Sequence, residues 1–186
     1  IDPDARYADM MERALYNGIM SGLQLDGTAY FYVNPLEVWP GNDYRDDKRH
    51  VKNQRQSWFD VACCPPSLAR VIGEVATYFY LVGEDGVYVN QYASSRAELS
   101  VDGRPVVLAQ ETAYPHDGGV TLRVQADASF ALKLRKPYWC ERFTLRVNGT
   151  MARPEWEGSY AVLKRAWQAG DVVYIDMAMT PRRAFA

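Results

Sequence analysis

Residues 68–92, LARVIGEVATYFYLVGEDGVYVNQY, change their hydrophobic period partway along, and this change decides the fold. In the first half the apolar side chains recur every three or four positions, which is typical of a helix. After Gly83 the pattern alternates every second position, which is typical of a strand. We therefore expect a helix from Pro66 to Leu81 that stops at Gly83. Its apolar stripe comprises Leu68, Val71, Ile72, Val75, Ala76 and Phe79.

The chain after residue 84 contains eight short runs that are rich in β-branched and aromatic residues. Turn signals such as Asp-Gly, Gly-Gly, Asn-Gly and Ala-Gly separate these runs. Eight runs in about a hundred residues predict an antiparallel β-sandwich over residues 85–186. The runs read GVYVNQY, AELSV, PVVLA, VTLRVQA, SFALKLRK, FTLRVNG, SYAVLKR and DVVYIDMA.

The chain before residue 84 predicts helices and a long loop. Residues 1–23 show helical spacing, with Asp2 as N-cap, Pro3 at the first helical position and an end near Gly22. The following TAYFYVNPL predicts a short strand or extended segment, and the polar run at residues 40–58 predicts a surface loop.

The fold class expected from these patterns is α+β, with a helical domain at residues 1–84 and a β-sandwich at residues 85–186. Two helices cannot bury both of their faces by themselves. The helical part is therefore expected to pack against further helices or against a partner.

Composition excludes several classes of partner. The 186 residues are 48% hydrophobic and carry a net charge of −2, with the cations scattered rather than clustered, so we expect neither nucleic acid nor an anionic membrane surface as a partner. The longest apolar run, Val75 to Val82, is far shorter than the ~20 residues of a membrane span. Three cysteines, two of them adjacent, do not form a disulfide framework, which favours a reducing compartment such as the bacterial cytoplasm. No signal peptide is visible, and the start at Ile1 looks internal or processed.

The adjacent thiols of Cys63 and Cys64 precede two prolines. A residue before proline avoids the helical region, so Cys64 and Pro65 are expected to be extended and the helix to begin at about Pro66. Both thiols would then lie just ahead of a helix N-terminus, which lowers a thiol pKa and favours nucleophilic or metal-binding chemistry. The alternative, that they are small buried hydrophobes, is about equally consistent with the residues.

As a metal signal the cysteine pair is incomplete. A closed zinc site takes four ligands. The other candidates, Cys140, His50 and His116, show no regular spacing to the pair, so any metal site needs ligands from elsewhere.

A series of sequence strings covers nearly the whole chain in a fixed order. They are YADMMERALYNGIMSGLQLDGTAYFYVNPL, DVACCPP with LARVIGEVATYFY, GVYVNQY, YPHDGGVTL, LRKPYW, VNG and RAWQAGDVV. In this order they resemble the C-terminal half of glycoside hydrolase family 127, the β-L-arabinofuranosidases. The most specific pieces are Glu12 to Asn17 and Cys63 to Pro66.

The resemblance implies the last helices of an (α/α)6 barrel followed by the β-sandwich. It implies a zinc ion held by three cysteines and a glutamate, with Cys63 as the nucleophile of a retaining mechanism, Cys64 as a second zinc ligand and Tyr32 close to the sugar and to the nucleophile. The remaining ligands and the acid/base glutamate are expected upstream of Ile1. The implied partners are an arabinofuranoside-containing oligosaccharide or glycoconjugate and the rest of the parent polypeptide.

Other polar and aromatic residues have simpler interpretations. We expect surface or structural roles for Glu37 and Glu74, a solvated His50, a structural His116, a buried Cys140, a hairpin turn at Asn148 and packing roles for Trp139, Trp156 and Trp167.

Two functions therefore compete. The first is part of a zinc-cysteine glycoside hydrolase, inactive as an isolated fragment because it lacks an acid/base residue and half of the zinc ligands. The second is a noncatalytic β-sandwich module for carbohydrate binding or assembly. Buried thiols and a tryptophan-lined groove would favour the second.

Overall fold

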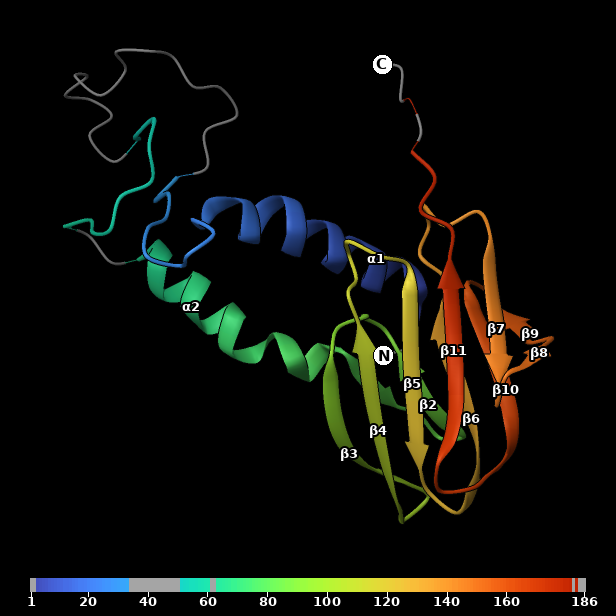
Figure 1. Ribbon diagram of the computed structural model, residues 1–186. Helices are drawn as coiled ribbons and strands as arrows, with labels where there is room; N and C mark the ends of the chain where they lie inside the picture. The colour runs from blue at the N-terminus through green and yellow to red at the C-terminus, as the bar shows by residue number, and fades with distance from the viewer. Residues whose placement is uncertain (1–2, 34–50, 61–62, 182, 184–186) are drawn as a thin grey trace. The chain divides into compact units, whose positions relative to one another are not determined.

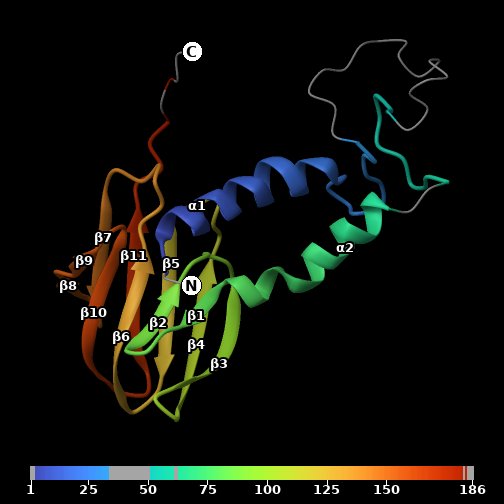
Figure 2. The same ribbon diagram turned by 180° about the vertical axis from the view of Figure 1, so that it is seen from behind.

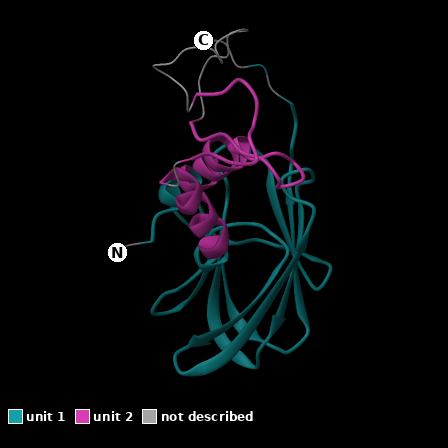
Figure 3. Ribbon diagram, turned by 90° about the vertical axis from the view of Figure 1, so that its left-hand side faces the viewer, with its two compact units in different colours: residues 1–9, 76–186 teal, residues 10–75 magenta. Residues whose placement is uncertain are grey.

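The structure is a computed structural model that describes residues 3–33, 51–60, 63–181 and 183 (Figure 1). It divides into two compact units, coloured separately in Figure 3. One unit is Met10–Val75, and the other joins Ile1–Asp9 to Ala76–Ala186.

The first helical segment begins at Ala5, later than the sequence predicts. The Asp4 carboxylate accepts a hydrogen bond from the backbone N–H of Arg6 at 2.8 Å, and the Asp4 carbonyl accepts from Tyr7 N–H at 3.1 Å. Pro3 therefore precedes the helix instead of occupying its first position, and Asp2, the expected N-cap, lies outside the described residues. The predicted end near Gly22 is confirmed. The segment consists of α1 (Ala5–Arg13), a π-helical stretch (Ala14–Ile19) and a 3-10 turn (Met20–Gly22).

The second helix both starts and ends earlier than predicted. α2 spans Cys64–Glu74 and continues as a 3-10 turn, Val75–Tyr78. The expected last turn, up to Leu81, is instead strand β1 (Tyr80–Val82), which pairs with the strand that follows it. Tyr80, Leu81 and Val82 are aromatic or branched residues that suit a pleated sheet, and the available strand partner overrides the helical spacing.

All eight predicted runs form strands. They are β2 (Gly86–Val89), β3 (Ser95–Val101), β4 (Arg104–Thr112), β5 (Gly119–Gln125), β6 (Ala128–Arg135), β7 (Phe143–Val147), β10 (Tyr160–Trp167) and β11 (Asp171–Met177). Two short strands that the sequence analysis missed, β8 (Thr150–Ala152) and β9 (Glu155–Glu157), lie between β7 and β10.

The strands form two sheets that face each other in Figures 1 and 2. One sheet has the order β1-β2-β6-β10-β9 and the other β3-β4-β5-β11-β7-β8. The predicted sandwich is confirmed, but it is not antiparallel throughout, because β2 pairs with β6 in parallel, with Val87 opposite Leu132. The chain between these two strands forms β3, β4 and β5 of the opposite sheet, each antiparallel to the next. After these three strands the chain enters β6 in the same direction as β2.

The core lies between the two sheets. Side chains alternate between core and surface along β5, in which Val120, Leu122 and Val124 are fully buried. Each such aliphatic side chain contributes about 1.5–3 kcal/mol of burial free energy. The core also contains Leu108, Leu132, Leu134, Trp167, Val173 and Ile175.

The first turn of α1 belongs to the same unit as the sandwich. Arg135 at the end of β6 is fully buried and forms an ion pair with Asp9, and its Nε donates to the Asn90 carbonyl at 2.5 Å. The Gln91 side chain donates to the carbonyl of Ala8 at 2.8 Å. A buried polar network thus fastens the start of α1 to the ends of strands β2 and β6. In the described part of the chain no helix is long and apolar enough to cross a membrane.

Candidate functional site

The cysteine pair lies at the N-terminus of α2. Cys63 precedes the helix with φ −82° and ψ −42°, and Cys64 is its first residue. The expectation that Cys64 and Pro65 are extended is therefore wrong. Prolines fit the first helical turn because the N–H groups there have no acceptor within the helix, and this gain outweighs the pre-proline restriction.

The two thiols are exposed and close together. Cys63 Sγ lies 3.6 Å from Cys64 Sγ, and both side chains are accessible to solvent in this chain. The interpretation of both cysteines as small buried hydrophobes is therefore wrong for this pair. It holds for Cys140, which is 2% exposed and donates to the carbonyl of Arg142.

Tyr32 brings a hydroxyl group to Cys63. The residue follows the first helical segment by ten positions, in the stretch predicted to be extended, and its Oη lies 2.5 Å from Cys63 Sγ. Among the described residues of this stretch, which end at residue 33, regular structure is limited to single bridges from Tyr30 to Leu23 and to Gln56. The structure thus places together Tyr32 and Cys63, which the sequence separates by 31 positions.

The electrostatics of this contact favour a charged sulfur. The hydrogen bond from Tyr32 lowers the pKa of the Cys63 thiol, with smaller contributions from Cys64 and from backbone N–H groups at the start of α2. The same contact raises the pKa of the Tyr32 phenol. Both shifts favour a protonated phenol that donates its hydrogen bond to the Cys63 sulfur when that sulfur is ionised. A lowered thiol pKa raises the fraction of Cys63 that is present as the nucleophilic thiolate at a given pH.

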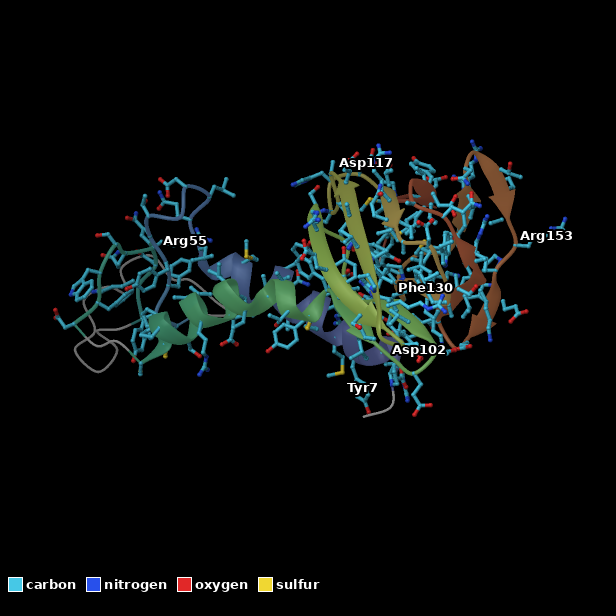
Figure 4. All side chains as sticks on the ribbon, turned by 90° about the horizontal axis from the view of Figure 1, so that it is seen from below. Tyr7, Arg55, Asp102, Asp117, Phe130 and Arg153 are labelled. Carbon is cyan, nitrogen blue, oxygen red and sulfur yellow. The ribbon has the colours of Figure 1, made fainter. Side chains whose placement is uncertain are left out.

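Residues 55–59, which are the end of the predicted surface loop and the residue after it, contact Tyr32 and its neighbours. Phe59 is 9% exposed, and its ring centroid lies 5.4 Å from those of Tyr30 and Tyr32. Arg55, labelled in Figure 4, donates to the carbonyls of Ser21 and Gly22 at the end of the first helical segment. The signal that could have shown this role is the aromatic pair Trp58-Phe59 within an otherwise polar run.

A cavity of about 210 Å³ is lined in part by Cys64. Its wall includes the side chains of Phe31, Tyr32, Cys64 and Leu68. Cys64 and the hydroxyl-bearing Tyr32 thus contribute to a cavity at the start of α2, and Cys63 adjoins it through its contacts with both residues.

The thiol pair fits a shared metal ion in geometry and chemistry. Two thiolates on one tetrahedral zinc, with zinc–sulfur distances of about 2.3 Å, lie about 3.8 Å apart. The observed separation of Sγ atoms is 3.6 Å. Within the described ranges no group of three or more His, Cys, Asp or Glu side chains is arranged to hold a metal. The described part of this chain therefore offers two thiol ligands of the four that a closed site takes.

The other residues considered from the sequence take structural or surface positions. Glu74 ends α2 on the surface, and exposed His116 donates its backbone N–H within a turn. Asn148 and Gly149 form the predicted hairpin turn between β7 and β8, with φ values of 52° and 81°. Glu37 and His50 lie outside the described residues.

The three sandwich tryptophans do not form one sugar-binding face. Trp167 is 2% exposed and donates to the carbonyl of Phe130 at 3.1 Å. Trp139 stacks on Tyr114 at 6.2 Å, and Trp156, about half exposed, packs edge-on against Phe143. Their predicted packing roles are confirmed.

Comparison with known proteins defines the class. Residues 1–77 match the family model described as the catalytic domain of GH127 β-L-arabinofuranosidase. Residues 86–179, more than half of the chain, match the model described as the GH127 middle domain. The chain belongs to glycoside hydrolase family 127, and the predicted resemblance is confirmed. The expected domain boundary at 84–85 stays a prediction.

Relatives of known name agree with this membership. The chain is 34% identical over 187 aligned positions to the non-reducing end β-L-arabinofuranosidase of Bifidobacterium longum subsp. longum, which covers 96% of this chain and 28% of that protein. The structure of the present chain resembles that of a GH127 β-L-arabinofuranosidase from Geobacillus stearothermophilus T6, with a TM-score of 0.88 and 46% identity. The match covers 100% of the present chain and 30% of the Geobacillus chain. A GH127 β-arabinofuranosidase gives a TM-score of 0.82, 36% identity and coverage of 95% and 29%. The chain thus spans less than a third of the length of these relatives.

Proposed function

We propose that this chain is part of a retaining glycoside hydrolase that releases terminal β-L-arabinofuranose from oligosaccharides or glycoconjugates, with Cys63 as its nucleophile. The observation that supports this most directly is the hydrogen bond from Tyr32 to an exposed Cys63 thiol at a helix N-terminus. The family membership and the names of the relatives support the reaction class and the sugar.

The proposed chemistry proceeds in two displacements. The Cys63 thiolate attacks the anomeric carbon, so that a C–S bond forms while the bond from that carbon to the leaving oxygen breaks through an oxocarbenium-like transition state. An acid elsewhere in the polypeptide protonates the leaving oxygen. In the second step that residue, now a base, takes a proton from water, and the water oxygen displaces the sulfur. Two inversions return the original configuration.

Tyr32 assists both displacements in this proposal. In the first, its hydroxyl orients Cys63 Sγ and keeps the sulfur ionised, at the cost of some nucleophilicity, because nucleophilicity falls as the pKa falls. In the second, the sulfur becomes the leaving group, and a hydrogen bond that favours the thiolate lowers the cost of its departure.

We further propose that Cys63 and Cys64 bind zinc, with the remaining ligands and the acid/base residue contributed by parts of the polypeptide outside this chain. When bound, zinc supplies a positive charge that keeps coordinating thiols deprotonated at neutral pH. This proposal also implies that residues 1–186 alone are catalytically inactive, because two ligands hold the metal weakly and no acid protonates the leaving group. The bacterial cytoplasm stays a prediction for the location.

The noncatalytic alternative lacks the two features that would favour it. Cys63 and Cys64 are exposed rather than buried. Trp167 and Trp139 are used in packing rather than in a common groove. We therefore do not adopt the noncatalytic module.

The test is a cysteine series in the full-length polypeptide that carries this chain. Cys63→Ala should abolish release of arabinose from an aryl β-L-arabinofuranoside, whereas Cys140→Ala, which changes a buried sandwich thiol, should retain turnover. Mass spectrometry after denaturation of the enzyme in the presence of a slow fluorinated substrate should show one pentosyl adduct on the peptide that contains Cys63. Turnover by the Cys63→Ala enzyme, or an adduct on a carboxylate, contradicts the proposal.

A further inference from the structure

Phe59 is buried although it lies in a segment without helix or strand. It is 9% exposed, whereas its neighbour Trp58 is 73% exposed. Burying an aromatic ring from a loop costs the conformational entropy of ordering that loop. The contacts of the Phe59 ring must therefore compensate for this cost.

The backbone around Phe59 is tied to the segment that carries Tyr32. Tyr30 and Gln56 exchange both of their backbone hydrogen bonds at 3.0 Å, and Phe31 N–H donates to the Gly22 carbonyl at 2.9 Å. The Arg55 guanidinium lies 4.7 Å from the ring centroid of Phe31 and donates to the Ser21 carbonyl at 2.7 Å. The end of the first helical segment, residues 30–32 and residues 55–59 are therefore held together by several independent contacts.

The Phe59 ring fills the space between two tyrosine rings. It meets Tyr30 at an interplanar angle of 46° and Tyr32 at 51°, each at a centroid distance of 5.4 Å. Tilted packing at this distance is favourable for aromatic pairs and restricts the rotation of each ring. The Tyr32 side chain is thus held on its ring by Phe59 and at its hydroxyl by Cys63.

We propose that Phe59 is a positioning residue, which holds the ring of Tyr32 so that the Tyr32 hydroxyl is directed at Cys63 Sγ. This inference rests on the proposed function, because it assigns Phe59 to the same nucleophile. Phe59 acts on the reaction only through Tyr32. A shorter side chain at position 59 removes this ring contact and weakens the restraint on the Tyr32 ring. The Tyr32 hydroxyl is then hydrogen-bonded to Cys63 Sγ for a smaller fraction of the time.

The experiment compares Phe59→Leu, Tyr32→Phe and the double variant in the full-length enzyme. A hydrogen bond to a charged acceptor changes an equilibrium on the order of tenfold, so Tyr32→Phe should lower kcat by roughly that factor. Phe59→Leu should lower kcat similarly with KM changed less than threefold. The double variant should be no slower than Tyr32→Phe alone, because Phe59 has nothing to position once the hydroxyl is gone. Phe59→Tyr, which keeps a ring, should restore most of the rate.

A second measurement does not depend on turnover. In metal-free enzyme at pH 7, alkylation of Cys63 by iodoacetamide, followed by peptide mass spectrometry, should slow by the same factor in Tyr32→Phe and Phe59→Leu. The matched control is Phe143→Leu, which removes the aromatic contact of a sandwich residue with Trp156. It should change neither kcat nor the rate of Cys63 alkylation. If Phe59→Leu is poorly folded, Phe59→Met, which keeps the volume without a ring, is expected to give the same slowing.

The outcomes separate this inference from the proposed function. If Cys63→Ala abolishes turnover but Phe59→Leu matches the wild type, Phe59 does not position Tyr32 and only this inference fails. Additive losses in the double variant also overturn it, because they show that Phe59 acts on something other than Tyr32. Turnover by Cys63→Ala overturns the proposed function, and this inference with it.

Discussion

Asp9→Ala should destabilise the sandwich unit more than any change on the exposed face of α1. It removes the carboxylate that pairs with Arg135, a guanidinium with no exposed surface. Breaking a buried ion pair by deleting one partner costs about 3–5 kcal/mol, because it leaves an uncompensated charge in the core. With a urea m-value of about 2 kcal/mol/M, the unfolding midpoint should fall by about 1.5–2.5 M.

The assay is urea unfolding followed by the fluorescence of the buried Trp167, whose indole lies in the sandwich core. The control is Arg6→Ala, which breaks the ion pair with Asp4 on the same helix, where the Arg6 side chain is 83% exposed. That variant should keep the wild-type midpoint. Asp9→Leu combined with Arg135→Met removes both charges and should recover most of the loss. Equal midpoints for Asp9→Ala and Arg6→Ala would refute the reasoning.

Three further predictions follow from single contacts. The midpoint of the pH profile for alkylation of Cys63 should lie at a higher pH in Tyr32→Phe than in the wild type, since the lost hydrogen bond no longer lowers the thiol pKa. Iodoacetamide rates measured across pH 6–10 test this, and identical profiles for the two proteins would contradict it. Gly86→Ala should destabilise the sandwich by more than about 2 kcal/mol, because the new Cβ would lie 1.9 Å from the carbonyl oxygen of Ala131 on the parallel neighbour; the urea midpoint measures it, with Gly103→Ala as an uncrowded control that carries only the strain of its positive φ. Asp171 accepts hydrogen bonds from Asn148 and from the Gln168 backbone, which lower its folded-state pKa below the usual 3.8. Its stabilising contribution is therefore present at neutral pH and is lost as the pH falls through that lowered value; Asp171→Asn should flatten the acid side of the stability curve, and an identical acid midpoint would exclude this role.

The hydrophobic period alone determined most of the β-sandwich. Each predicted run became a strand because alternating side chains must place one face in a core, and a shift by one residue would expose every apolar side chain. The two short strands β8 and β9 were missed because three residues carry too little periodic signal. The Asn148-Gly149 turn was also predictable, since both residues adopt positive φ.

Element ends were decided by tertiary partners. Spacing extended the second helix to Leu81, but Tyr80 to Val82 find a strand partner in β2. The first helix begins at Ala5 rather than Pro3, and the Asp4 carboxylate accepts a hydrogen bond from the Arg6 N–H just ahead of it. Such choices between two local solutions depend on contacts that a one-dimensional pattern does not contain.

The adjacent cysteines and the prolines that follow them are enough by themselves to predict thiols at a helix start, because proline suits the first helical turn and the helix dipole favours a thiolate there. The approach of Tyr32 to Cys63 was implied only through family resemblance. The support from Phe59 and the burial of Arg135 against Asp9 were not visible in the sequence at all. Local patterns report what a residue's own neighbours along the chain favour, whereas these contacts join positions 27 to 126 residues apart and exist only once the chain has folded.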